Sequence, residues 1–192
     1  ARQRDAGGPE AALRQLVEPA PAMREIQRAG LATAEPEFVS SLADVPAGPM
    51  LLVANEYLDC LPARQFHRDG EAWRECVIGL GADGELTFGL AADEQAPPAG
   101  TGETNAVVEV QTGLDLIVAD LVSRSAPFRA LFVDYGPSDI APGDSLRSYK
   151  DGQQVSPLAL PGEADLTVDV DFGRFARLAR AAGLDVAGPA PQ

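Results

Sequence analysis

The sequence predicts an α/β fold built on a parallel sheet. Two uninterrupted apolar runs, 50–54 and 130–133, are typical of strands that are buried on both faces of such a sheet. The segment 114–123 between them carries apolar residues at helical spacing. Strands that alternate with helices along the chain indicate a layered α/β architecture.

The elements before residue 50 alternate in the same way. Gln15-Leu16-Val17-Glu18 predicts a short strand. A helix is expected over 20–29, because Pro21 lies near its start and Gly30 follows its end. Phe38-Val39 then predicts a second short strand.

Residues 64–90 have the pattern of an antiparallel meander. Asp69-Gly70 and Asp83-Gly84 each separate two strand-like segments, and Asp-Gly between apolar runs is a strong hairpin signal. We expect this meander to be inserted into the main sheet and to be followed by a flexible loop over 91–105. Gly79, Gly81 and Gly84 match a dinucleotide-binding spacing, but strand-like residues follow them where a helix is needed, so a hairpin turn is the better interpretation.

The C-terminal part predicts one more helix. A helix over 172–182 is expected, with Asp171 as its N-cap. The segment 137–165 is rich in loop-forming residues, and 184–186 has the composition of a last strand.

Composition excludes several function classes. The net charge of −14 disfavours binding to nucleic acid or to an anionic membrane, and no apolar stretch is long enough to span a bilayer. The two cysteines, Cys60 and Cys76, lack the spacing of a zinc site, so we expect no metal and predict reduced thiols in a cytosol.

The candidate chemistry follows the strand predicted over 50–54. Asn55, Glu56 and Asp59 lie directly after it, and ligands of open α/β sheets bind beyond the carboxyl ends of the strands. The two carboxylates could act as acid and base or could hold a cationic group, or they could simply belong to a solvated loop. His67 is the only histidine, which excludes a serine–histidine or cysteine–histidine catalytic arrangement around other residues.

Several motifs, in this order, resemble the MidA-like class I methyltransferases, a family that includes the mitochondrial assembly-factor methyltransferase of respiratory complex I. The similarity extends over nearly the whole chain. It is carried by Glu18-Pro19-Ala20-Pro21-Ala22-Met23-Arg24, Ala54-Asn55-Glu56-Tyr57-Leu58-Asp59-Cys60-Leu61-Pro62-Ala63-Arg64-Gln65-Phe66, Phe132-Val133-Asp134-Tyr135-Gly136, Gly162-Glu163-Ala164-Asp165-Leu166-Thr167 and Val170-Asp171-Phe172.

The resemblance implies a Rossmann-like fold that uses S-adenosylmethionine. Glu18 would bind the ribose of this cofactor, and Ser41 and Leu42 would lie near its adenine. Asn55 and Glu56 would border the methyl-transfer pocket, supported by Asp59. The family's eukaryotic branch methylates an arginine of a complex I subunit, so the resemblance implies an arginine of a protein as the substrate.

The sequence also departs from the family. The glycine-rich loop and the first strand are not present before Glu18, so we expect an incomplete sheet, a partial domain over 1–192 and weak cofactor binding by this chain alone. Two histidines common in the family are replaced, within 148–155 and just before Val170. Two alternatives therefore stay open: a non-catalytic interaction module that holds a basic partner, and a hydrolase that uses Glu56 and Asp59.

Overall fold

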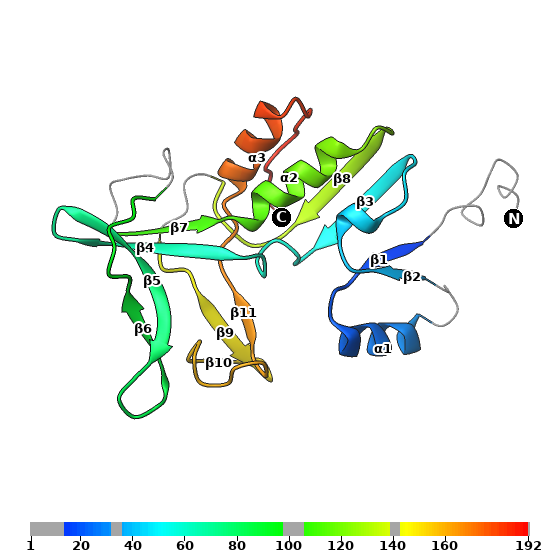
Figure 1. Ribbon diagram of the computed structural model, residues 1–192. Coiled ribbons are helices and arrows are strands. Elements are labelled where there is room, and N and C mark those ends of the chain that lie inside the picture. Colours follow the sequence, from blue (N-terminus) through cyan, green and yellow to red (C-terminus); the bar gives the residue numbers. More distant parts are fainter. Residues whose placement is uncertain (1–13, 32–35, 98–105, 139–142, 192) are drawn as a thin grey trace, which may run out of the picture. The chain divides into compact units, whose positions relative to one another are not determined.

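The computed structural model describes residues 14–31, 36–97, 106–138 and 143–191 (Figure 1). The chain divides into two compact units. The first comprises residues 1–49 and 123–127, and the second comprises residues 50–122 and 128–192.

The first unit contains a parallel strand pair and a helix. β1 (Gln15–Val17) pairs with β2 (Glu37–Val39), with Val17 opposite Val39. α1 (Pro21–Gly30) connects the two strands, and the short 3-10 helix η2 (Leu42–Asp44) follows β2. The strands and the helix predicted in this region are confirmed.

The second unit contains a parallel pair formed by the two apolar runs. β3 (Met50–Asn55) pairs with β8 (Phe128–Val133) along its whole length, so that both strands end at the same edge. The prediction that these strands are buried on both faces was wrong in the structure: Leu51, Val53 and Leu131 are 80%, 64% and 56% exposed. Helices cover only the face that carries Ala54 and Phe132, and on the described residues β3 has no partner strand other than β8.

Two helices pack on the covered face. α2 (Gly113–Ser123) and α3 (Phe172–Ala181) lie beside β8 in Figure 1. Leu58, Leu114 and Val170 form the core between them, and Phe132 meets Phe175 edge to face with 5.0 Å between the ring centroids. Both helices were predicted, as was the Asp171 N-cap, which accepts a hydrogen bond from the amide of Arg174.

A four-stranded antiparallel sheet forms the other part of this unit. Its order is β6-β5-β4-β7, with β4 (Ala63–Asp69), β5 (Ala72–Leu80), β6 (Leu86–Leu90) and β7 (Val107–Gln111) (Figure 1). Both Asp-Gly hairpins are present. Of the dinucleotide-like glycines, Gly81 and Gly84 lie in the β5–β6 turn and Gly79 lies near the end of β5, so the pattern belongs to a hairpin, as interpreted from the sequence. Trp73 packs against the cluster of Phe66, Val108 and Val110.

For the C-terminal half, one prediction was incomplete and one was wrong. The segment expected to be loop-rich contains a small antiparallel sheet of order β10-β9-β11, formed by β9 (Arg147–Lys150), β10 (Gln153–Val155) and β11 (Asp165–Thr167). Residues 184–186 form no strand, because the amide of Leu184 instead bonds to the carbonyl of Ala179 and continues the end of α3. Of the loop expected over 91–105, residues 98–105 lie outside the described residues.

A glycine after β8 allows two backbone segments to meet. The carbonyl of Tyr135 accepts a hydrogen bond from the amide of Val170 at 2.9 Å. A Cβ atom at Gly136 would lie only 2.1 Å from the carbonyl oxygen of Val170. The sequence Asp134-Tyr135-Gly136 therefore needs its glycine for this close approach.

We predict that Gly136→Ala strongly destabilises the protein. The added methyl group overlaps backbone atoms, which cannot move aside as a flexible side chain would, and overpacking of this kind costs about 1–3 kcal/mol or more. Urea unfolding of the intact protein measures the loss. Gly79→Ala is the matched control, because a Cβ at Gly79 meets nothing within 4 Å; equal stabilities for the two variants would contradict the proposed close approach.

Candidate functional site

The turn that follows β3 carries the residues singled out in the sequence. Asn55 is the last residue of β3, and Asn55 and Glu56 are both exposed. The amide of Glu56 donates to the carbonyl of Val133 at 2.9 Å, so the turn begins where β3 and β8 end together. These polar groups therefore lie at the carboxyl edge of a parallel strand pair, where α/β proteins bind their ligands.

Glu56 has a backbone conformation that is costly for its residue type. Its φ is +48°, in the left-handed region. A residue with a Cβ pays about 1–2 kcal/mol there, whereas glycine adopts this region freely. Strained residues of this kind concentrate at functional sites. Among the described residues other than glycine, Asp144 and Asp151 also have a positive φ, but only Glu56 directly follows a strand of the parallel pair.

One carboxylate holds the turn in place. Oδ2 of Asp134, directly after β8, accepts hydrogen bonds from the amides of Tyr57 (3.0 Å), Leu58 (2.8 Å) and Asp59 (3.2 Å). Its other oxygen accepts from the amide of Tyr135 at 2.8 Å. Charge-assisted bonds to several successive amides fix a backbone segment more firmly than neutral ones. Asp134 thus ties the turn after β3 to the end of β8.

Asp59 lies at the far end of this turn and faces β11. Its Oδ2 accepts a hydrogen bond from the hydroxyl of Thr167 at 2.8 Å. Burial raises the pKa of the Asp59 carboxyl above its ordinary value, the nearby charges of Asp134 and Asp165 raise it further, and the Thr167 bond opposes the rise. A cation beside Asp59 would offset this repulsion.

Gln111 connects the turn to the core. This side chain is 3% exposed; its amide nitrogen donates to the carbonyl of Leu58 at 3.0 Å, and its oxygen accepts from the amide of Asp171 at 3.1 Å. A buried amide that is satisfied on both sides fixes its neighbours, because losing either bond would leave a buried group unpaired. The end of β7, the turn and the start of α3 are thereby held together.

The predicted cofactor residues gather in the first unit. Glu18 follows β1, while Ser41 and Leu42 follow β2, so they lie at the same edge of the β1–β2 pair. Arg24 bridges this edge, donating to the carbonyl of Glu18 and to the hydroxyl of Ser40. Leu42 is buried, and Ser41 forms a capping box with Asp44.

The structure brings the sequence-predicted residues together in two sets. Asn55, Glu56 and Asp59 share the turn after β3 in the second unit, and Glu18, Ser41 and Leu42 share one edge in the first. That the two sets line one hollow stays a prediction. Sequence reasoning missed Asp134 as the partner of the turn, although its place directly after the predicted strand 130–133 was a usable signal.

Two further findings concern the described part of the chain. It contains no group of three or more histidine, cysteine, aspartate or glutamate side chains arranged to hold a metal ion. None of the helices in the described ranges is both long enough and apolar enough to cross a membrane.

Comparison with known proteins gives a consistent family. A family model described as "Putative S-adenosyl-L-methionine-dependent methyltransferase" matches residues 9–190. The chain is 36% identical over 152 residues to the protein arginine methyltransferase NDUFAF7 homolog, mitochondrial, of Caenorhabditis elegans, covering 74% of this chain and 36% of that protein. It is 34% identical over 166 residues to the mouse protein arginine methyltransferase NDUFAF7, mitochondrial, covering 82% of this chain and 37% of that protein. The chain thus spans about a third of the length of these relatives.

Solved structures support the fold. A Burkholderia thailandensis protein crystallised with S-adenosyl-homocysteine superimposes with a TM-score of 0.72 at 21% identity, covering 89% of this chain and 48% of that one. A native structure of a protein from the same species superimposes with a TM-score of 0.70 at 20% identity, covering 89% of this chain and 50% of that one. The chain therefore has an α/β methyltransferase-like fold.

We predict that Asp134→Ala destabilises the protein by about 1–3 kcal/mol, because three amides of one turn lose their shared acceptor. Asp134→Asn should recover part of the loss, since its side-chain oxygen still accepts but carries no charge. Urea unfolding of the intact protein measures both. Asp93→Ala is the control for an exposed aspartate; if it costs as much as Asp134→Ala, the assigned role of Asp134 is wrong.

Proposed function

We propose that this chain carries out methyl transfer to an arginine side chain of a protein. The premise is that the chain belongs to the family of S-adenosyl-L-methionine-dependent methyltransferases, whose model matches residues 9–190. The observation that carries this proposal is Glu56, a carboxylate held at a left-handed backbone position where the parallel strands β3 and β8 end. The names of the relatives supply the reaction and the substrate residue.

The first unit fits the proposed cofactor. Glu18 directly follows β1, the position from which an acidic residue accepts hydrogen bonds from ribose hydroxyls in dinucleotide-type folds. Its two oxygens each accept one bond, from the amide of Ala20 at 2.9 Å and from the side chain of Gln27 at 3.1 Å. A carboxylate offers about four acceptor sites, so both oxygens retain capacity for a ribose. The bound S-adenosyl-homocysteine of the Burkholderia structure supports the same class of cofactor.

The second unit supplies the groups for the substrate. S-adenosylmethionine would supply a methyl group bonded to a positively charged sulfur. A guanidine nitrogen of the substrate forms the new bond to the methyl carbon as the carbon–sulfur bond breaks, the bonding electrons go to sulfur, and the nitrogen loses a proton. We assign Glu56 to orient the guanidinium group through paired hydrogen bonds and to accept that proton. Asn55 would border the same pocket, and Asp59 would support the turn.

The acidic character of the chain agrees with a basic protein substrate. The net charge of −14 attracts positively charged surfaces and accelerates their association at low salt. The family resemblance extends the proposal to a subunit of respiratory complex I as the substrate. This finer assignment rests on the resemblance alone.

A non-catalytic interaction module is the alternative that the same features permit. Such a protein would retain the acidic surface and would have no need for strain at Glu56. The strained carboxylate therefore favours the enzyme. The two experiments that follow separate the two functions, since the module requires neither cofactor nor transfer.

We predict that Glu18→Gln weakens cofactor binding while the fold is retained. The loss of a charged acceptor for two hydroxyl groups should raise the dissociation constant of S-adenosylmethionine about 10- to 100-fold. Calorimetric titration of the intact protein, with any sequence that flanks residues 1–192, gives this value. Glu37→Gln, at an exposed position of β2, should leave the constant unchanged; equal effects of the two substitutions would remove Glu18 from the cofactor site.

For Glu56→Gln we predict unchanged cofactor affinity and a fall in methyl transfer of about 100-fold or more, because the general base and the charged partner of the guanidinium are lost. The assay incubates the intact protein and radiolabelled S-adenosylmethionine with a lysate from cells that lack the gene, and methylarginine is identified after acid hydrolysis. Glu71→Gln, in the β4–β5 hairpin turn, is the control. Label in another amino acid, or full activity of Glu56→Gln, would contradict the proposal.

A further inference from the structure

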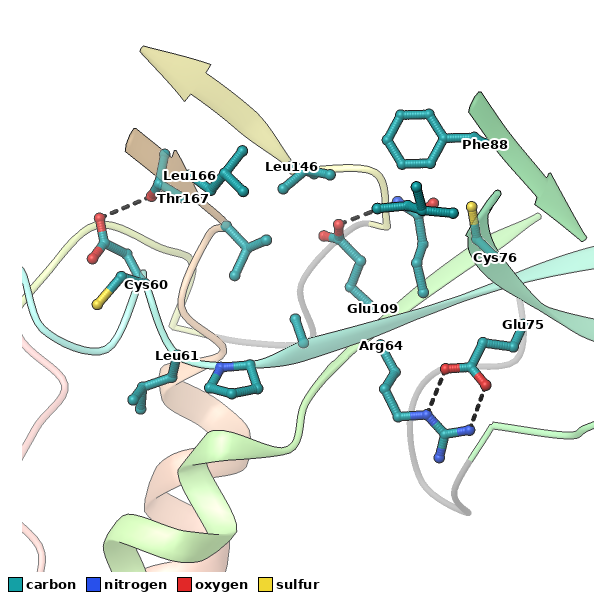
Figure 2. Close-up of a pocket in the computed structure, with 16 residues that line it drawn as sticks. Cys60, Leu61, Arg64, Glu75, Cys76, Phe88, Glu109, Leu146, Leu166 and Thr167 are labelled. Carbon is teal, nitrogen blue, oxygen red and sulfur yellow. Dashed lines mark hydrogen bonds and ion pairs between the residues drawn. The ribbon is translucent and has the colours of Figure 1, made fainter. Parts of the chain in front are cut away.

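A groove lies beside the candidate turn, on the side of the four-stranded sheet. It has a volume of about 300 Å³, at the small end of the range of about 300–1,000 Å³ found for ligand sites. Its lining comes from the end of the turn, from β4, β5, β6, β7 and β11, and from the residue before β9 (Figure 2). Residues of the second unit alone line this groove.

The charged groups of the groove leave an excess of negative charge. Three carboxylates, Asp59, Glu75 and Glu109, and one guanidinium, Arg64, line it, so the net charge is three negative against one positive, or −2. Figure 2 shows Arg64 paired with Glu75 through two hydrogen bonds, both 2.7 Å long. This ion pair neutralises Glu75. The excess charge therefore lies on Asp59 and Glu109.

Neither of these carboxylates has a cationic partner among the described residues. Glu109 accepts hydrogen bonds from the amide and the hydroxyl of Ser145, at 2.9 and 2.5 Å, and a long one from Gln65. Asp59 accepts from the hydroxyl of Thr167. Neutral donors orient both carboxylates without cancelling their charge, and partly buried charges without a counter-ion are unfavourable. The groove is thus complementary to a cation.

The remaining wall of the groove is apolar and exposed. Ile78, Phe88 and Leu166 line it, and they are 57%, 45% and 49% exposed. An arginine side chain has an apolar stem and a charged planar head, so it can cover such a wall while its head pairs with a carboxylate. Apolar neighbours of that arginine in an extended segment would cover the rest.

We propose that this groove holds a basic, partly apolar segment of the protein substrate, next to the arginine that is methylated. The inference rests on the proposed function and deepens it by assigning the site of substrate recognition. Asp59 connects the two places, since it lines the groove and lies three residues beyond Glu56 on the turn fixed by Asp134. A segment bound in the groove would then lie beside the turn that carries Glu56.

The test uses direct binding, which does not depend on methyl transfer. The probe is a fluorescein-labelled hexapeptide of sequence glycine-arginine-valine-arginine-valine-glycine, with both ends blocked so that neither carries a charge. It is titrated with the intact protein, and binding is followed by fluorescence anisotropy. A second probe carries neutral citrulline in place of both arginines. We expect saturable binding of the arginine probe, weakened by salt, and at least about tenfold weaker binding of the citrulline probe. Equal binding of the two probes, or none below millimolar protein, would overturn the proposal.

Matched variants place the binding in the groove. Ile78→Lys adds a positive charge to its wall and should weaken arginine-probe binding about tenfold. Leu80→Lys adds the same charge two residues further along β5, at a position that is 73% exposed and outside the groove lining, and should have little effect. Glu109→Gln should also weaken binding while retaining hydrogen bonds to Ser145. If both lysine variants weaken binding equally, the probe binds the general negative surface and the groove assignment is wrong.

The methylarginine assay keeps the two proposals separate. Groove variants should raise the KM for protein substrate and leave the dissociation constant of S-adenosylmethionine unchanged. An active enzyme whose KM is unaffected by Ile78→Lys contradicts the groove and leaves the proposed function intact. A protein that binds the probe in the groove and forms no methylarginine contradicts the proposed function.

Discussion

The candidate site depends on one carboxylate oxygen that accepts hydrogen bonds from three successive backbone amides. Oδ2 of Asp134 bonds to the amides of Tyr57, Leu58 and Asp59 and so joins the end of β8 to the turn after β3. The backbone amides of a turn that follows a strand must find hydrogen-bond acceptors. A charged acceptor forms stronger hydrogen bonds than a neutral one and so restricts the movement of the turn more. Glu56 can then be held in a left-handed conformation that an isolated chain would avoid.

This constraint continues into the core and toward the groove. Leu58, the central residue of the turn, is 1% exposed and packs with Leu114 and Val170, while its carbonyl accepts from Gln111. The segment after β8 is pressed against Val170 at Gly136, where no Cβ fits. Packing and hydrogen bonds thus fix the middle of the turn, with Glu56 at its start and Asp59, which lines the groove, at its end.

Local signals in the sequence predicted most elements, and contacts between distant residues account for the rest. The helices, the Asp-Gly hairpins and the strand runs follow from periodicity and turn chemistry, which act over a few residues. β7 alternates apolar and polar residues over 108–111 and could have been predicted. The small sheet of β9, β10 and β11 lacks such a pattern, because its short strands are stabilised by pairing with each other. The exposed face of β3 was mispredicted because an apolar run does not show which of its faces a helix covers.

Amide hydrogen exchange tests the central claim most directly. The amides of Tyr57, Leu58 and Asp59 should exchange slowly in the intact protein, and in Asp134→Ala all three should lose protection together. The amide of Val110, which pairs with β4 and whose side chain is buried beside Phe66, should stay protected. That pattern would show that a single carboxylate holds the turn. Unchanged protection of the three amides in Asp134→Ala would contradict the account.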